Sequence, residues 1–412
     1  MRRRCARLLR WLLILGALPW GPLVLSQAPP GPLTPAEARF LEAHWRRPLV
    51  PQGAPPASFT PLERSLRPES CGTCHPAQWA DWKTTVHARS MGPGVAAQLV
   101  EMVRQDPASA QECLPCHAPL AEQAPTTSRS NGHQSSPTFD PALQTQGLVC
   151  AACHVRKHER FGPPRRDGSL SVSTPTSGLP HAGVTRTSAF TRSEFCSSCH
   201  QFAANGLALN GKLLENTYEE WKASPAAQGG LQCQDCHMPD RRHLWRGIHD
   251  PEMVRQGVEI TLTTDQARHR PGDQVQAVLT ITASRVGHFF PTYVTPRVVA
   301  RAELVDADGH PIGATKEERS IGRDLPPDLS REVADTRIPP GGRFRFAYRR
   351  RLDRPGLRLR VTVTVFPDHF YVDVFEALLR TGAGAGTAEL HRALAAARGS
   401  AFCIFNREVP LT

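Results

Sequence analysis

The length and charge of the chain already exclude one class of protein. Its 412 residues are enough for two or three domains, and the formal net charge is +11. Five of the positive charges are arginines within the first ten residues, which leaves +6 on the rest of the chain. Because no basic stripe interleaved with aromatic side chains accompanies this excess, we expect no nucleic-acid binding.

The N-terminal stretch, MRRRCARLLRWLLILGALPWGPLVLSQ, has a basic start and an apolar run that Pro19 and Pro22 interrupt. A membrane span needs about 20 consecutive apolar residues, and this run is shorter. We therefore predict a signal peptide over residues 1–26, cleavage before Gln27, and export to the bacterial periplasm. A retained segment would instead be an anchor, and no later stretch is long enough to span a membrane.

Residues 27–68 are rich in proline and read as an N-terminal arm. Prolines at this density exclude a long helix or a central strand. We expect one short helix around Pro35 to Trp45, which packs on the region that follows.

Residues 69–256 contain the pattern C-x-x-C-H five times, and it uses ten of the twelve cysteines. This pattern is the attachment signal for c-type haem, in which two thiols bond to the porphyrin and the histidine binds the iron. We therefore predict five covalently bound haem c groups. The attachment residues are Cys71, Cys74, Cys113, Cys116, Cys150, Cys153, Cys196, Cys199, Cys233 and Cys236. The proximal iron ligands are His75, His117, His154, His200 and His237.

Paired cysteines have two other common uses in proteins. Zinc ribbons combine such pairs into four-ligand sites, but zinc does not require a histidine after every pair. A disulfide across two intervening residues would restrain almost no chain. Residues 69–256 contain too few regularly spaced apolar residues for a hydrophobic core of ordinary size. We therefore expect a mainly α-helical, loop-rich domain in which the porphyrins form the core. The surplus of Arg and Lys suits their propionate groups.

The stretch after the first motif, PAQWADWKTTVHARSM, predicts one amphipathic helix from residue 76 to about 90. His87 would then lie roughly 18 Å from His75 along that helix, too far to bind the same iron. A distal ligand to another haem is the favoured role of His87, and an exposed histidine is the alternative.

After Gln256 the hydrophobic period changes from helical to alternating, as in GVEITLT, QVQAVLTI and LRLRVTVTV. We predict an antiparallel β-sandwich over residues 257–368. Two short C-terminal helices and a tail follow over residues 369–412, with Cys403 as a buried small side chain.

Residues 66–254 resemble the multihaem cytochromes c related to the tetrahaem cytochrome that accepts electrons from hydroxylamine oxidoreductase. The matching stretches are ESCGTCHPAQWADWKTTVHARSM, ECLPCHAPLAEQ, SEFCSSCHQF and CQDCHMPDRRH. In that family the histidine of the W-x(4)-H-A element is a distal ligand to a different haem, which implies the same role for His87. This chain has five motifs where the family has four.

Other histidines beside the motifs are further candidates for distal ligands: His158, His181, His243 and His249. His288, in VGHFFPTYVTPR, lies between two predicted strands and resembles a loop of some large multihaem cytochromes that caps a haem. The remaining histidines, among them His44 in the arm, are expected at the surface.

The axial ligands of the haem irons decide which function the protein can have. Haems with two histidines exchange electrons but bind no substrate, so we predict a periplasmic electron-transfer cytochrome with unidentified redox partner proteins. The alternative is a multihaem oxidoreductase with one open haem acting on a small nitrogen or sulfur compound, with Tyr293 and Arg297 as candidate proton donor and anion-binding residue. The pentahaem nitrite reductases use C-x-x-C-K at the catalytic haem, and no motif here ends in lysine. A haem-scaffolded binding protein is a third class.

Overall fold

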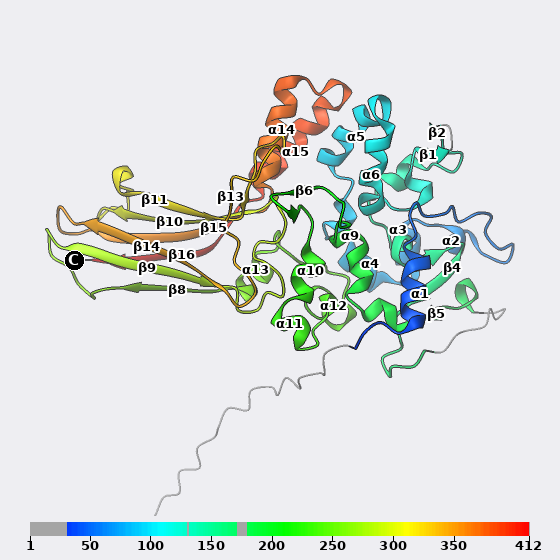
Figure 1. Ribbon diagram of the computed structural model, residues 1–412, viewed down its shortest axis with the longest axis horizontal. Helices are drawn as coiled ribbons and strands as arrows, with labels where there is room; N and C mark the ends of the chain where they lie inside the picture. Colours follow the sequence, from blue (N-terminus) through cyan, green and yellow to red (C-terminus); the bar gives the residue numbers. More distant parts are fainter. Residues whose placement is uncertain (1–30, 130–131, 171–178, 412) are drawn as a thin grey trace, which may run out of the picture.

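The computed structural model describes residues 31–129, 132–170 and 179–411, so the predicted signal peptide lies outside the described residues. Helices and loops gather at one end of the molecule, and long strands extend from the other (Figure 1). No helix among the described residues is long and apolar enough to cross a membrane.

The helical half contains short helices joined by loops. They are α1 (Pro35–His44), α2 (Pro61–Arg64), α3 (Pro68–Cys74), α4 (Pro76–Trp82), α5 (Pro93–Gln105), α6 (Pro107–His117), α7 (Pro141–Gln144), α8 (Cys150–His154), α9 (Glu194–His200), α10 (Thr217–Lys222), α11 (Pro225–Gln228), α12 (Cys233–His237) and α13 (Pro251–Gly257). Many begin with proline, whose fixed φ suits the first helical position, where no backbone N–H is needed. The prolines that exclude long helices therefore define where the short ones start.

Nearly all the strands are antiparallel. Short pairs in the helical half are β1 (Thr126–Arg129) with β2 (Gly132–Ser135), β3 (Val155–Arg156) with β4 (Glu159–Gly162), and β6 (Ala208–Leu209) with β7 (Lys212–Leu213). β5 (Thr185–Arg186) pairs with β4 in parallel. Two larger sheets follow, with the strand orders β11-β10-β15-β16 and β14-β9-β8. Their bounds are β8 (Glu259–Thr264), β9 (Gln274–Thr282), β10 (Arg297–Val305), β11 (Glu317–Ile321), β14 (Arg343–Arg351), β15 (Arg358–Phe366) and β16 (Phe402–Pro410), and a separate short pair is β12 (Arg323–Asp324) with β13 (Ala334–Asp335).

The two larger sheets bury a shared hydrophobic core. The alternating residues predicted to point inward on β9 are all at most 2% exposed: Val275, Ala277, Leu279 and Ile281. The same holds for Leu359, Val361, Val363 and Val365 of β15. Alternation therefore located these strands correctly, because each has one face on the core and one facing outward.

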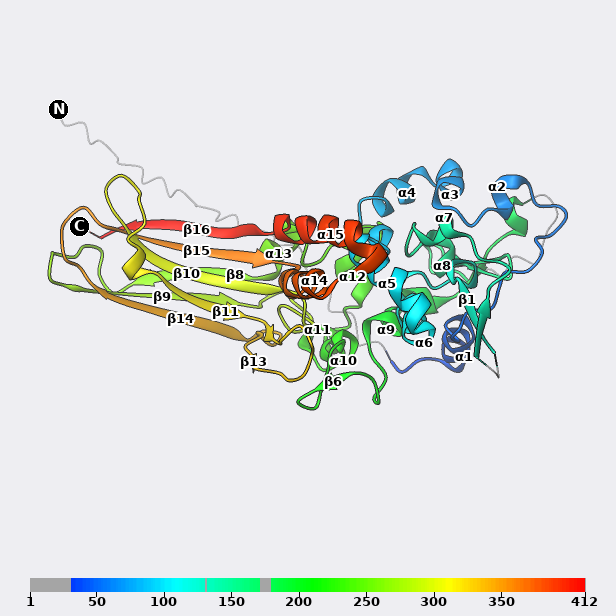
Figure 2. The ribbon, with the colours of Figure 1, turned by 90° about the horizontal axis from the view of Figure 1, so that it is seen from above.

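The C-terminal part differs from the prediction. Helices α14 (His369–Thr381) and α15 (Thr387–Gly399) form as expected and lie against α5 of the helical half (Figure 2). The predicted tail, however, is strand β16, which pairs with β15 and extends the sheet beyond the expected boundary at residue 368. Cys403 lies on β16 and is exposed, so its predicted burial was wrong.

Helix α4 ends at Trp82, earlier than predicted. The hydroxyls of Thr84 and Thr85 donate hydrogen bonds to the carbonyls of Asp81 and Trp82, at 2.7 Å each. Such side chains compete for helix carbonyls and end the helix. His87 consequently lies in a separate 3₁₀ turn, residues His87–Arg89.

The arm packs on the helical half through α1. His44 is 2% exposed, its Nε2 lies 2.9 Å from the Cys153 carbonyl, and its ring is surrounded by Phe40, Phe161 and Phe195. The expected surface position of His44 was therefore wrong.

Candidate functional site

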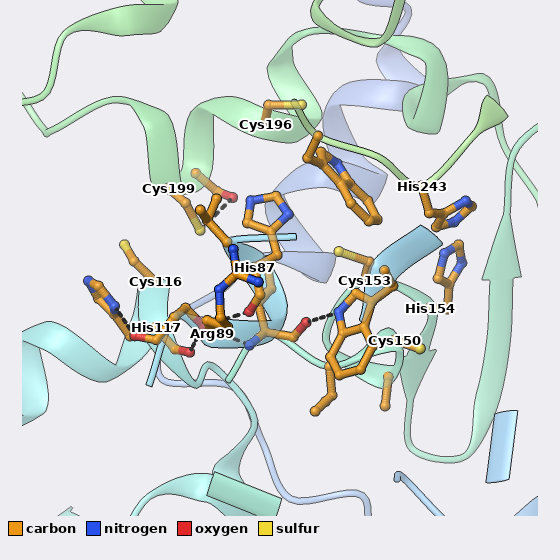
Figure 3. Close-up of a pocket in the computed structure, with 18 of the residues that line it drawn as sticks. His87, Arg89, Cys116, His117, Cys150, Cys153, His154, Cys196, Cys199 and His243 are labelled. Carbon is orange, nitrogen blue, oxygen red and sulfur yellow. Dashed lines mark hydrogen bonds between the residues drawn. The ribbon is translucent and has the colours of Figure 1, made fainter. Parts of the chain in front are cut away.

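The helical half encloses a cavity of about 2370 Å³. A usual small-molecule pocket has roughly 300–1,000 Å³, so this one has room for several large groups. Its lining includes the cysteines of the first four C-x-x-C-H motifs and the histidines His75, His117, His154 and His200. Figure 3 shows cysteines and histidines of several motifs facing this cavity.

Each motif forms a short helical turn. They lie at the ends of α3, α6 and α9, and make up α8 and α12. Because residues three apart share one face of a helix, the two sulfurs of each motif point to the same side, as attachment to one porphyrin requires. No disulfide joins any of the described cysteines. Among the described residues, no cysteines and histidines converge as a zinc site would require.

Three pairs of histidine rings face each other at the same separation. The ring centroids lie 6.2 Å apart in His87–His200, His154–His243 and His237–His288. Two imidazole nitrogens each about 2 Å from a shared metal ion leave roughly 6 Å between the ring centres. Each of these three pairs therefore has the spacing of the two axial ligands of a single haem iron.

The hydrogen bonds of the rings agree with this fit. Nδ1 of His117, His154 and His237 lies 2.6–2.8 Å from the carbonyls of Ser90, Phe161 and Arg246, respectively. His243 and His288 likewise direct Nδ1 to the carbonyls of Arg241 and Phe289. A ligating histidine commonly donates its other N–H to a carbonyl, which fixes the ring and leaves Nε2 for the metal.

Two other sequence candidates direct the opposite nitrogen to the protein. Nε2 of His158 lies 3.0 Å from the Gly53 carbonyl, and Nε2 of His249 lies 3.0 Å from Asp368 Oδ1. His158 is also absent from the cavity lining, whereas His249 borders the cavity. This arrangement does not favour either side chain as an iron ligand.

The first motif has a neighbouring histidine, His181, but the two rings do not form a close pair like the three above. Burial lowers the pKa of His181, and the nearby charges of Arg160 and His75 contribute in the same direction. Both His181 and His75 border the cavity. His181 therefore lies near His75 and beside the same cavity.

The second motif shares one feature with the first. Like His75, His117 has no histidine ring facing it at the 6.2 Å separation among the described residues. Its cavity walls include Met102 of α5 and Tyr371 and Phe375 of α14.

Burial favours the neutral form of five of the paired rings. It lowers the pKa of His87 to about 3 and that of His154 and His237 to about 4, with neighbouring histidines contributing in each case. The pKa values of His243 and His288 are lowered for the same main reason. Neutral imidazole is the form that binds a metal ion, so the site is prepared for ligation.

Sulfur contacts show which motifs are neighbours. In three pairs the two thiols lie close enough for one to shift the pKa of the other: Cys71 and Cys150, Cys116 and Cys199, and Cys196 and Cys233. The first motif therefore adjoins the third, and the fourth adjoins both the second and the fifth.

The arm contributes to one of these junctions. The guanidinium of Arg47 donates to Cys199 Sγ at 3.1 Å and to Cys116 Sγ at 3.5 Å. Sequence reasoning missed Arg47, since one arginine among many in the sequence carries no local signal.

Known proteins match part of the chain that forms this cavity. The family described as Cytochrome c554 and c-prime matches residues 70–155. Cytochrome c-554 of Nitrosomonas europaea is 27% identical over 144 residues, which are 32% of this chain and 55% of the relative. The chain is a multihaem cytochrome c. The part of the chain that matches cytochrome c-554 spans about half the length of that curated relative.

The fold has a solved counterpart of nearly the same extent. The crystal structure of a penta-heme cytochrome c552 from Thermochromatium tepidum superposes with a TM-score of 0.59 and 19% identity, covering 85% of this cytochrome and 100% of that chain. At this identity the likeness concerns the fold. It extends beyond the 70–155 segment into the sheets.

Proposed function

We propose that this protein is a periplasmic pentahaem cytochrome that transfers electrons between redox partner proteins. It would consist of a mainly helical haem domain and a β-sandwich domain. The observation that carries the proposal is the set of three histidine pairs at 6.2 Å, each with a motif histidine on one side. A haem held by two histidines exchanges electrons and has no open coordination position.

Each pair has defined members. His200 would bind with His87, His154 with His243, and His237 with His288, while His75 would bind with His181. The pair at the fifth motif joins the two regions of the chain, because His288 lies in the loop between β9 and β10. His158 and His249 are not part of this ligand set.

The sulfur contacts support an order for the electron route. The first and third motifs adjoin, Cys153 of the third motif lies near enough to Cys196 of the fourth to affect its pKa, and the fourth adjoins the second and fifth. The fourth motif would therefore be the branch point of the route.

The first prediction concerns stoichiometry. Protein matured in a host that attaches haem c should carry five covalently bound haems, because all five motifs present both sulfurs on one side of a helical turn. Intact mass spectrometry after removal of free haem measures this number. Four or fewer haems on fully matured protein would contradict the pentahaem proposal.

A second candidate function is supported by the second motif. His117 has no histidine facing it among the described residues, which fits an iron with an open position. Such a site could convert a small molecule, as in a multihaem oxidoreductase, with electrons supplied through the fourth motif.

The second prediction separates these two functions. The oxidised protein should show four low-spin haems and one high-spin haem by electron paramagnetic resonance and optical spectroscopy. Five low-spin haems would leave the electron carrier as the only candidate.

A further inference from the structure

One arginine of the N-terminal arm touches the attachment residues of two different motifs. Arg47 Nη2 lies 3.1 Å from Cys199 Sγ, and its Nη1 lies 3.5 Å from Cys116 Sγ. Both cysteines are labelled in Figure 3, and each is the residue directly before the histidine of its motif. Cys116 belongs to the second motif and Cys199 to the fourth. A single guanidinium therefore contacts the sites at which two haems would be attached.

The backbone of the arm is anchored on both sides of Arg47. Before it, the ring of Trp45 packs against Phe195 of α9, with ring centroids 5.2 Å apart. After it, Leu49 is buried in a hydrophobic cluster that includes residues of α8. These two contacts attach the arm to the helices of the fourth and third motifs. The place of the Arg47 side chain is thus set by packing, unlike that of an arginine on an exposed loop.

The charge of Arg47 forms no ion pair with a carboxylate of the residues that the structure describes. Its neighbour Arg46, by contrast, lies 3.9 Å from Glu42 Oε1. Arg297, the anion-binding candidate from the sequence, lies 2.6 Å from Asp324 Oδ1. Arg47 is half-buried, and the sulfurs that it contacts are weak acceptors. These contacts offset little of the cost of removing a guanidinium from water, so stability does not explain its position.

A structural link between the two helices does not explain it either. Helix α6, which carries Cys116, and helix α9, which carries Cys199, are in direct contact with each other. Cys199 Sγ lies 3.8 Å from the carbonyl of Pro115 on α6. The junction of the second and fourth motifs is therefore closed without Arg47.

A fixed positive charge at this junction has a defined effect on haem chemistry. Reduction of a haem adds one electron to the ferric iron and lowers the charge of the haem by one, and no bond forms or breaks. In the proposed function the electron comes from a redox partner protein. A nearby cation stabilises the reduced haem relative to the oxidised one, and more strongly where water is excluded. The guanidinium of Arg47 therefore raises the reduction potential of a haem attached beside it.

We propose that Arg47 sets the reduction potentials of the haems on the second and fourth motifs and raises both through one shared charge. The inference rests on the proposed electron-transfer function and deepens it. Because the fourth motif is the branch point of the proposed route, Arg47 biases electrons on that route toward these two haems.

Redox titration of the haem-loaded full-length protein tests the inference. In Arg47→Met, which removes the charge and keeps most of the apolar stem, two of the five haems should move to lower potential. The expected change is about tenfold in the equilibrium constant for reduction of each, for an effective dielectric constant of about 20. For a one-electron step, a tenfold change corresponds to about 59 mV. Optical and electron paramagnetic resonance spectra recorded against potential measure each step.

Two further variants separate the charge from other effects of the substitution. Arg46→Met is the matched control, since it removes the neighbouring charge from a side chain that is 75% exposed. All five potentials should stay unchanged in this control, because solvent and salt screen an exposed charge. Arg47→Lys keeps the charge without the planar fork of the guanidinium. It should return both haems most of the way to their wild-type potentials.

The outcomes distinguish this inference from the proposed function. Unchanged potentials in Arg47→Met with all five haems attached would overturn the inference and leave the electron-transfer function standing. An equal shift in Arg46→Met, or a shift that Arg47→Lys does not reverse, would overturn it as well. If the second or fourth motif of the wild type carries no haem, the pentahaem function and the inference both fall. Should Arg47→Met mature with fewer than five haems, Arg47→Gln, which keeps an N–H donor without the charge, decides in its place.

Discussion

The variant His288→Ala is expected to open one further haem to external ligands while all five stay covalently attached. Attachment depends on the C-x-x-C-H motifs, but the ring of His288 lies 6.2 Å from that of His237 and is nearly parallel to it, at 10°. Removing the ring leaves one axial position without its ligand. Titration of the reduced protein with carbon monoxide should show one more binding haem than in the wild type.

His158→Gln is the control for this experiment. His158 was also a candidate from the sequence, but its Nε2 is directed to the Gly53 carbonyl, so its replacement should leave ligand binding unchanged. His87→Ala should instead behave like His288→Ala, with the new binding site at the fourth motif. Equal ligand binding by wild type and His288→Ala would show that the β-sheet region takes no part in ligation.

The helical turn of each C-x-x-C-H motif could be predicted from sequence because its geometry is local. Five residues in a row form each motif, and one helical turn is enough to place two sulfurs on the same side. The distal ligands depend instead on contacts between distant segments. His158 and His243 both follow a motif closely, yet His243 faces His154 while His158 packs against the arm. No local sequence pattern shows which ring nitrogen of a histidine will hydrogen-bond to a carbonyl from a distant segment, as His158 does with Gly53.

The fold shows the same division between local and distant information. Strands β9 and β15 were predictable because one face of each is fully buried, which produces strict alternation. Strand β16 was missed because most of its residues are exposed or half-buried, and its pairing with β15 is irregular between Val363 and Thr364. The early end of α4 was missed because two threonine hydroxyls outweigh a helical hydrophobic pattern.

The variant Arg337→Met is expected to destabilise the protein by about 3–5 kcal/mol, because it leaves a buried carboxylate without its partner. Arg337 Nη1 lies 2.8 Å from Glu220 Oε1, and the two side chains are only 5% and 4% exposed. Methionine keeps most of the length of the apolar stem, so the main loss is the charge. Denaturant unfolding followed by circular dichroism measures the change in the free energy of unfolding.

Arg301→Met is the matched control, since it removes the same charge from an exposed pair in the same region. Arg301 Nε lies 2.6 Å from Glu318 Oε1, but the side chains are 45% and 36% exposed, and such a pair contributes about 0–1 kcal/mol. Similar losses in both variants would mean that burial does not set the importance of the Arg337 pair. A large loss in Arg337→Met alone has a second consequence, because Glu220 also holds the backbone of Phe289, next to His288. Loosening of this loop should then weaken ligation, so that a fraction of the folded variant binds carbon monoxide at the fifth motif as His288→Ala does.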